Sequence, residues 1–534
     1  MRFLVAFGLA LIAVTTAVVL GNRARQWNDE LALALPPLAH EPPRLDDPGT
    51  PRLTGRVVLI VIDGLGSDEA RLPYLDELRA RGVAATARVP YPTISRPNYV
   101  TILTGVPPRD SGVRANRVEA PVAVDTVMDR VRAAGLRVAT ASDFGSLASL
   151  FLRHTPSITG IDWIERGGHV APPPPVTWPV DDAIRVGSLD ALGPAIGELA
   201  AGDAALIPVL VLDVDRAGHA FGIGAEYRAA AAAVDRMLRI AFARIDLARD
   251  TVIITADHGH VAPGGHGGDE REVSHVPLVL AGRGIVPGAA APTARLIDVA
   301  PTVAALLGVP APGHAEGRAL VELLQLTPAQ AARRTAVDGA RGDAVAAVVA
   351  AALASRVTPA PGRLAALVAG LVLAVVLAIA LGRRGAIAVT PAAAVGALGF
   401  AAVGVAVVLI TRGRVSPSYV PSLARTEQLG ALAIAAAVAV QVIASGRVMR
   451  RARDRVAAAN GIALVGLVVS LAAVALVRAW FSPPHLDVPP PFWMVMVPAL
   501  DVAAAACGLA TAVALAVAVV RRHPGARHAA AGES

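Results

Sequence analysis

The sequence predicts an α/β domain, with a central sheet flanked by helices, followed by an all-α transmembrane region. Two observations carry this prediction. Between about residues 53 and 325, short apolar runs rich in β-branched residues alternate with helical patterns, as in domains built on a buried sheet. From Leu364 onward, long apolar stretches alternate with arginine-containing loops. We therefore expect one water-facing domain joined to a membrane-embedded helical region.

The composition supports this division. Apolar residues make up 54% of the 534 positions, which is too many for a purely soluble enzyme. The net charge of +7 is carried by Arg, because the chain contains no Lys, and this excludes Lys nucleophiles and Schiff-base chemistry. The arginines cluster near membrane ends, so we expect no nucleic-acid binding. The single Cys507 excludes a disulfide framework and a Cys₄ zinc site.

The N-terminal segment, residues 1–22, is apolar from Phe3 to Leu20 after Met1-Arg2. It has about the length that spans a bilayer, roughly 20 residues. A small-x-small cleavage pattern is poor after the run, so a membrane anchor is favoured, with a signal peptide as the alternative. Residues 23–52, rich in Pro and Asp from residue 36, are predicted to be a linker.

Residues 53–325 are predicted to form the α/β domain. The predicted buried strands are Val57–Ile62, Val209–Leu212, Thr251–Ala256 and Val276–Leu280. The predicted helices are Leu72–Arg81, Thr126–Ala134 and Glu226–Ile245. Four consecutive prolines interrupt the pattern in Ala171–Trp178, which we expect to be a surface loop or lid.

A helical connector at residues 326–362 precedes a five-helix transmembrane region at residues 363–522 and a cytoplasmic tail at residues 523–534. The predicted spans are Leu364–Leu381, Ala386–Ile410, Leu429–Ala444, Gly461–Val477 and Phe492–Val520. An intramembrane acid such as Asp501 in the last span is a functional candidate.

Arginines predict the orientation of these spans. Ten arginines lie in the first loop, the third loop and the C-terminal tail, at positions 383, 384, 447, 450, 451, 453, 455, 521, 522 and 527. The other loops carry only Arg412, Arg414, Arg425 and Arg478. Since arginine-rich loops stay in the cytoplasm, the sequence predicts a multi-pass cell-membrane protein with an extracytoplasmic α/β domain.

Acidic and imidazole side chains follow three of the predicted strands. These side chains are Asp63, Asp215, His219, Asp257, His258 and His266. Because ligands collect at the carboxyl ends of strands in open α/β sheets, we expect these groups to meet. Such a set can hold two divalent metal ions, Zn²⁺ or Mn²⁺. Ser95 could place a hydroxyl between them, which indicates metal-assisted chemistry on a phosphate-like ester.

Each motif also has a structural interpretation. Asp63 could cap the following helix, and Ser95 could be an N-cap beside a helix N-terminus suited to an anion. Gly218 would allow a sharp turn between Asp215 and His219. The pair Asp257-His258, followed by the glycine-flanked His266, is the hardest to explain by packing. His260 and His275 are predicted to be structural histidines, with a direct role left open.

The order of these motifs resembles the alkaline phosphatase superfamily, most closely its type I phosphodiesterase/nucleotide pyrophosphatase branch. The motifs are Ile62-Asp63-Gly64, Ser95-Arg96-Pro97-Asn98, Asp215-x-x-Gly218-His219, Asp257-His258-Gly259 and His266-Gly267-Gly268-Asp269. The stretch around Asp215 and the short Asp257-to-His266 spacing also resemble the GPI ethanolamine phosphate transferases. The resemblance covers roughly residues 56 to 320 and implies an alkaline-phosphatase-like sheet.

The resemblance also implies roles for individual residues. One metal ion would be held by Asp63, Asp257, His258 and the Ser95 oxygen. The other would be held by Asp215, His219 and His266. Asn116 falls where phosphodiesterases bind a phosphate oxygen. The sequence departs from that branch in having Ser rather than Thr at position 95, and Arg96 where an aromatic residue is common, which suggests a more anionic or polar substrate.

Three hypotheses for function follow. The first is a metal-dependent phosphodiesterase or phosphohydrolase that forms a phosphoserine at Ser95 on the extracytoplasmic side. The second is a phosphoethanolamine-type transferase acting on a lipid or glycan. The third is an inactive membrane scaffold or transporter. The expected partner is a phosphoester, with a membrane lipid or lipid-linked glycan as one option.

Overall fold

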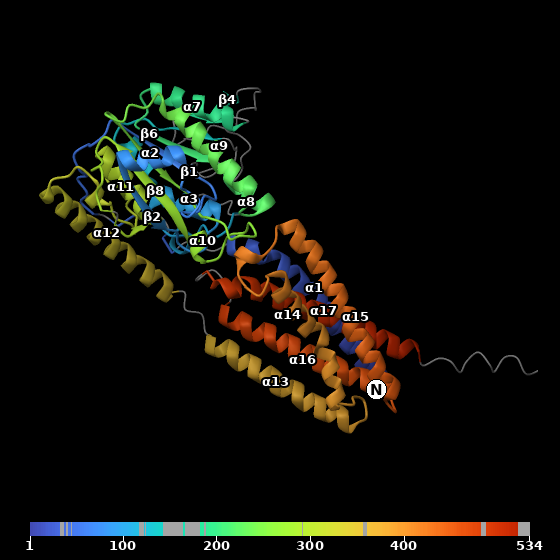
Figure 1. The fold of residues 1–534 in the computed structure, drawn as a ribbon. Coiled ribbons are helices and arrows are strands. Elements are labelled where there is room, and N and C mark those ends of the chain that lie inside the picture. The colour runs from blue at the N-terminus through green and yellow to red at the C-terminus, as the bar shows by residue number, and fades with distance from the viewer. Residues whose placement is uncertain are drawn as a thin grey trace, which may run out of the picture. The chain divides into compact units, whose positions relative to one another are not determined.

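The computed structural model forms two compact units, which we describe separately (Figure 1). The α/β unit comprises Asp29–Val357 with His485–Val488, and the helical unit comprises Met1–Asn28, Thr358–Pro484 and Pro489–Ser534. The structure describes residues 1–32, 37–38, 41–43, 45–116, 122, 124–142, 164–165, 182–185, 188–290, 292–355, 360–481 and 488–521. The predicted loop Ala171–Trp178 lies outside the described residues.

The α/β unit is built on one sheet with the strand order β4-β5-β3-β6-β1-β7-β8-β2-β9. The strands are β1 Arg56–Ile62, β2 Gly82–Arg88, β3 Ala139–Ser142, β4 Ile164–Glu165, β5 Asp182–Arg185, β6 Leu206–Val211, β7 Asp250–Thr255, β8 His275–Gly282 and β9 Ala294–Arg295. Neighbouring strands run parallel except at β8, which is antiparallel to both β7 and β2. The strands predicted from the apolar runs are therefore confirmed.

Helices pack against this sheet in two groups, α2, α7 and α8 around α9, and α3 and α5 around α11 (Figure 1). The helices are α2 Pro73–Arg81, α3 Ser95–Thr104, α4 Pro108–Ser111, α5 Val127–Ala133, α7 Leu189–Ala201, α8 Asp213–Phe221, α9 Ala225–Phe242, α10 Arg271–Ser274, α11 Val299–Leu307 and α12 Pro328–Ser355. Two 3₁₀ turns, η1 Leu296–Asp298 and η2 Val321–Leu323, complete the unit. The predicted helices correspond to α2, α5 and α9.

Strand β1 lies at the middle of the nine-stranded sheet, between β6 and β7. Its side chains from Val57 to Ile62 are all buried, as a strand covered on both faces requires. In the register, Ile62 pairs with Val211 of β6, and Val61 pairs with Thr255 of β7. The carboxyl ends of these three strands therefore end side by side.

The helical unit consists of long apolar helices. They are α1 Arg2–Ala32, α13 Ala360–Arg383, η3 Pro391–Ala397, α14 Leu398–Ile410, η4 Pro417–Tyr419, α15 Leu423–Arg451, α16 Arg455–Phe481 and α17 Pro491–Val520. Six segments among the described residues are long and apolar enough to cross a membrane, the first near the N-terminus. The five apolar stretches predicted after Leu364 therefore form helices, and the second starts at Pro391, in the 3₁₀ turn η3, rather than at Ala386.

One end of the helical unit gathers the start of α1 and the ends of two other helices. Arg2 forms an ion pair with Asp454, in the short turn before α16. The side-chain amide of Asn460 donates to the backbone oxygens of Arg2 and Ala386, at 3.0 and 2.9 Å. The start of α1, the turn after α13 and the start of α16 thus lie together, beside the arginine-rich loops of the sequence.

Asp501, which lies on the apolar helix α17, is paired inside the helical unit. Its carboxylate is fully buried and accepts a hydrogen bond from the Arg478 guanidinium of α16. The guanidinium carbon lies 5.0 Å from the centre of the Trp27 ring of α1. A charge in an apolar environment needs such a partner, so this contact gives Asp501 a structural role in joining α1, α16 and α17.

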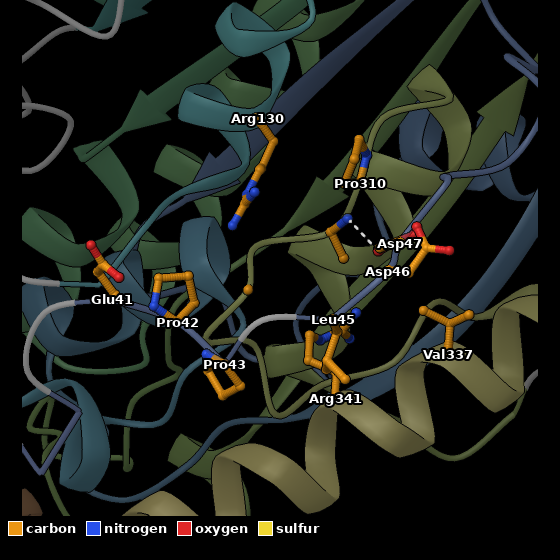
Figure 2. A pocket seen from close by; sticks show the side chains of 12 residues that line it. Glu41, Pro42, Pro43, Leu45, Asp46, Asp47, Arg130, Pro310, Val337 and Arg341 are labelled. Carbon is orange, nitrogen blue, oxygen red and sulfur yellow. Dashed lines mark hydrogen bonds between the residues drawn. The ribbon is translucent and has the colours of Figure 1, made fainter.

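The segment before β1, part of the predicted linker, packs on the α/β unit. Asp47 accepts hydrogen bonds from Arg334 of α12 at 2.7 and 3.1 Å, and from the Ala311 amide at 3.1 Å. A pocket of about 640 Å³ lies beside this contact, between residues 41–47, the 310–313 loop and α12 (Figure 2). Arg130 and Arg341 also line it. The segment before β1 thus forms one wall of a pocket in the α/β unit.

We expect Asp47→Ala to lower the free energy of unfolding of the α/β unit by about 3 kcal/mol, because it leaves the Arg334 guanidinium buried without this carboxylate. Differential scanning calorimetry of the full chain in detergent would measure the change. Asp46→Ala is the matched control, because Asp46 is exposed, and should change the free energy by less than about 0.5 kcal/mol. Equal effects of the two substitutions would show that the Asp47 contact does not stabilise the unit.

Candidate metal centre

The carboxyl ends of β6, β1 and β7 deliver the predicted ligands to one place. Asp63 follows β1, and Asp257 and His258 follow β7. Asp215 and His219 lie on α8, which begins directly after β6. His266 lies in the loop between β7 and α10, and Ser95 is the first residue of α3. The structure therefore brings together all six predicted ligands and the predicted nucleophile.

The first group of ligand atoms belongs to Asp63, Asp257 and His258, all within 4.8 Å of one another. His258 Nε2 lies 3.4 Å from Asp63 Oδ1 and 3.3 Å from Asp257 Oδ2. Ser95 Oγ lies 3.1 Å from the same His258 nitrogen. Since the three ligand side chains are buried, Ser95 is the member of this group that lies toward solvent.

The second group comprises Asp215, His219 and His266, with ligand atoms within the same 4.8 Å limit. His219 Nε2 lies 3.4 Å from Asp215 Oδ1 and 3.1 Å from His266 Nε2. His266 Nε2 lies 3.8 Å from Asp215 Oδ1. The His219 side chain is 47% exposed, so this group opens to solvent and is accessible to a substrate.

The local structure around Asp215 differs from the sharp turn that Gly218 suggested. Asp213–Phe221 is a continuous helix, and Asp215 and His219 are four residues apart on it. This spacing places both side chains on one helical face. Gly218 is needed for space instead, because a Cβ there would lie 2.7 Å from His260 Nε2.

Backbone carbonyls orient the two buried imidazoles. His258 Nδ1 lies 3.1 Å from the Gly259 carbonyl oxygen, and His266 Nδ1 lies 2.8 Å from that of Thr93. A carbonyl oxygen can only accept, so each Nδ1 carries the proton and donates it. Each Nε2 therefore presents a lone pair to its group, which is the arrangement of metal-ligating histidines.

Burial determines the charge states of these groups. Burial raises the pKa of Asp63 and Asp257 well above the ordinary value, and the neighbouring carboxylates raise both further. Asp63 Oδ1 and Asp257 Oδ2 are buried and have no hydrogen-bond partner among the described residues. Two such oxygens beside one imidazole nitrogen need a cation to remain charged, so the residues fit a divalent metal ion.

The imidazoles are also in the state that metal binding requires. Burial lowers the pKa of His266 to about 4, and it lowers the pKa of His258 well below the ordinary value. Both rings are therefore neutral at pH 7, as a ligating imidazole must be. Burial disfavours the charge of Asp215, but the His260 hydrogen bond and the surrounding imidazoles outweigh it and lower the Asp215 pKa.

Ser95 and Asn116 come together at the N-terminus of α3. The backbone N–H of Arg96, in the first turn of α3, donates to Asn116 Oδ1 at 2.9 Å. Ser95 is also in that turn, where the positive end of the helix dipole favours an anion. The hydroxyl, the exposed Asn116 amide and this helix end therefore lie close enough to act on one bound group.

Sequence reasoning missed the side chains that support the ligands. The Tyr99 hydroxyl donates to Asp63 Oδ2. Tyr99 follows Ser95 by four residues on α3, and this spacing could have indicated that the two side chains share a helical face. The Thr93 hydroxyl donates to the Gly268 oxygen and accepts from the Gly267 amide, both at 2.9 Å. His275 lies outside the described ligand groups, and its Nδ1 is 3.1 Å from Ser274 Oγ.

Comparison with known families agrees with this geometry. The family model described as type I phosphodiesterase / nucleotide pyrophosphatase matches residues 57–135, which include Asp63, Ser95 and Asn116. A second model, described as the metalloenzyme superfamily, matches residues 187–311, which include the remaining ligands. These two matches, together with the ligand geometry, support the assignment of the chain as a member of the alkaline phosphatase superfamily.

Curated relatives match part of the α/β unit. The chain is 35% identical over 123 residues to the 2,3-bisphosphoglycerate-independent phosphoglycerate mutase of Dinoroseobacter shibae, covering 22% of this chain and 23% of that protein. The enzyme of the same name from Synechococcus elongatus is 30% identical over 161 residues, covering 28% of this chain and 30% of that protein. The chain therefore spans less than a third of the length of these relatives.

Solved structures with a similar fold include murine ectonucleotide pyrophosphatase / phosphodiesterase 5. That structure has a TM-score of 0.37 at 14% identity and covers 48% of this chain and 96% of its own. A protein in the alkaline phosphatase superfamily from Vibrio parahaemolyticus has a TM-score of 0.37 at 17% identity and covers 54% of this chain and 76% of its own. At these TM-scores, the assignment to the superfamily depends on the family models and the ligand geometry alone.

We expect the purified chain to bind up to two divalent ions, with Asp257→Ala and His266→Ala each removing one. Each substitution deletes a ligand from a different group, and an incomplete ligand set holds its ion poorly. Elemental analysis after gel filtration would count the ions per chain. His275→Ala is the matched control, because His275 lies outside both groups, and should leave the count unchanged. Two ions in both ligand variants would contradict the assignment.

Proposed function

We propose that this protein is a metal-dependent phosphodiesterase or phosphohydrolase that acts through a phosphoserine intermediate at Ser95, on the extracytoplasmic side of a membrane. The observation that carries this proposal is the 3.1 Å contact between Ser95 Oγ and His258 Nε2, beside two ligand groups that share one edge of the sheet. A serine that only capped a helix would not require a neighbouring imidazole and two groups of metal-ligating side chains. The complete ligand set also argues against an inactive scaffold.

The ligand groups would hold one ion each, with Zn²⁺ and Mn²⁺ as the candidates. Asp63, Asp257 and His258 would hold the ion beside Ser95, and Asp215, His219 and His266 would hold the other. The ions would supply Lewis-acid stabilisation of the Ser95 alkoxide and of the leaving oxygen. Oxygen and imidazole ligands suit both Zn²⁺ and Mn²⁺, so the donor set indicates a divalent transition-metal ion of this kind.

The protein residues would perform the transfer in two steps. Ser95 Oγ loses its proton to solvent and attacks phosphorus, and the bond from phosphorus to the ester oxygen breaks as the new bond forms. The Asn116 amide and the first turn of α3 would orient the phosphoryl oxygens. Water then attacks phospho-Ser95, which releases phosphate or a monoester and restores the hydroxyl.

Transfer to an acceptor hydroxyl is the second candidate function. The curated relatives are named as mutases, so their reaction moves a phosphoryl group rather than releasing it. The exposed His219 leaves the second ligand group open to an acceptor as well as to water. A phosphoethanolamine-type transferase would use the same phospho-Ser95 intermediate, so the two functions differ only in the group that attacks it.

We expect Ser95→Ala to abolish turnover while leaving the metal content and folding largely intact, because it removes the attacking hydroxyl and leaves Asp63, Asp257 and His258 to hold the ion. Ser95→Thr should retain part of the activity, since it keeps a hydroxyl at the same carbon. Release of phosphate or alcohol would be measured from a phosphodiester, a phosphomonoester, a sulfate ester and phospholipid vesicles, with and without an added alcohol acceptor.

Thr104→Ala is the control for that series, because Thr104 lies in the last turn of α3, far along the helix from Ser95, and should leave turnover unchanged. A Ser95→Ala protein with full turnover would rule out the covalent mechanism. An alcohol product that carries the phosphoryl group would favour transfer over hydrolysis.

The helical unit supports the membrane location. The start of α1 and the turn after α13 lie at the end that carries the arginine-rich loops. Residues 29–357 connect to the opposite ends of these helices, at the close of α1 and the start of α13. Because arginine-rich loops stay in the cytoplasm, this connectivity supports an extracytoplasmic α/β unit.

We expect a cysteine introduced at Arg453 to resist an impermeant thiol reagent in intact cells, because its loop would be cytoplasmic. A cysteine at Asp46, which is exposed on the α/β unit, should react under the same conditions. The labelling would be read by mass shift after purification, in a background where the buried Cys507 is replaced by Ala. Reaction at position 453 without reaction at position 46 would reverse the orientation.

A further inference from the structure

Thr93 is a buried residue that contacts the loop carrying the ligand His266. Its hydroxyl accepts a hydrogen bond from the Gly267 amide and donates one to the Gly268 carbonyl oxygen, both at 2.9 Å. Its own carbonyl oxygen lies 2.8 Å from His266 Nδ1. Three consecutive residues of the ligand loop are therefore bound to one threonine, although 173 positions separate Thr93 from His266 in the chain.

The segment around Thr93 is also bound to the helix that begins with the nucleophile. The buried side-chain amide of Asn98, on α3, donates to the carbonyl oxygens of Pro92 and Ile94, at 2.9 and 3.1 Å. These two residues flank Thr93 in the chain, and Ser95 is the first residue of α3. The position of Thr93 is therefore fixed relative to Ser95.

The ligand loop meets the nucleophile segment through two kinds of contact. The His266 ring stacks on the His258 ring, with the ring centroids 3.7 Å apart and the planes at 13°, and His258 Nε2 lies 3.1 Å from Ser95 Oγ. The other contact is the Thr93 hydroxyl, which the loop reaches through Gly267, whose φ of 108° favours glycine. Stacked rings can slide over one another, whereas hydrogen bonds to two backbone groups are directional. The hydroxyl therefore restricts the loop more tightly than the ring stack does.

We propose that Thr93 is a positioning residue whose hydroxyl holds the His266 loop, and with it the second ligand group, in place relative to the nucleophile Ser95. This inference rests on the proposed function. A hydroxyl suits the role because it accepts and donates at the same time, so one side chain satisfies both backbone groups of the loop. A displacement of about 1 Å between reacting groups can lower a rate about 100-fold, so this link affects the transfer step as well as the second ion.

Thr93→Val keeps the branched shape of the side chain and removes the hydroxyl. We expect it to lower the affinity for the second ion about 10–100-fold, and to lower the turnover of a phosphodiester even at saturating Zn²⁺. Thr93→Ser keeps the hydroxyl and should remain close to the original protein in both measurements. Thr101→Val is the matched control and should change neither, because Thr101 is equally buried on α3 but donates to the Pro97 oxygen of the same helix.

The main measurement is Zn²⁺ binding to the full chain in detergent, by competition with a chelator of known affinity. The first ion is the internal reference, because a general loss of structure would weaken both ions, and His266→Ala identifies which binding step belongs to the second. Where Thr93→Val fails to fold, Thr93→Ala replaces it, since it removes the same hydroxyl and adds no bulk.

Three results would overturn the inference. They are an unchanged second-ion affinity without the hydroxyl, an equal loss for both ions, and a Thr93→Ser protein as weak as Thr93→Val. An original protein that binds no Zn²⁺ would instead contradict the proposed function.

Discussion

The site depends on three like-charged side chains being held at one edge of a parallel sheet. The strands β6, β1 and β7 are neighbours in register. The residues that follow their carboxyl ends therefore lie close to one another. Asp63 and Asp257 are buried there, and burial together with the neighbouring carboxylates raises the pKa of both well above the ordinary value. Buried acids that lie this close together stay ionised only beside cations of high charge density. The neighbouring neutral imidazoles complete a coordination sphere for such cations.

The strand ends and the ligand residues were predictable because they depend on short-range signals. Val57–Ile62 and Thr251–Thr255 are continuous apolar runs, and such runs are typical of strands buried on both faces. The polar residue after each run lies at the edge of the sheet because the strand ends there. The resemblance in motif order implied which of these residues would share a metal ion. The spacing of the residues alone could not indicate this.

The supporting contacts were not predictable, because they join residues far apart in the chain. Gly218 suggested a turn, but the helix α8 continues through it, and the space beside this glycine is occupied by His260 from the loop after β7. Tyr99 lies four residues after Ser95, yet its partner Asp63 is 36 residues away. A single sequence has no pattern that reports such contacts, since they are created by the packing of the sheet.

The connectivity of the helical unit has a consequence for how the protein is made. The first helix, α1, packs on α17, where a Cβ on Gly508 would lie 2.5 Å from the backbone oxygen of Ala13, although the whole α/β unit separates them in the chain. During synthesis α1 therefore leaves the ribosome long before its partners exist. The α/β unit has time to fold before the later helices are made, and the close glycine contact can form only when the last helix is complete.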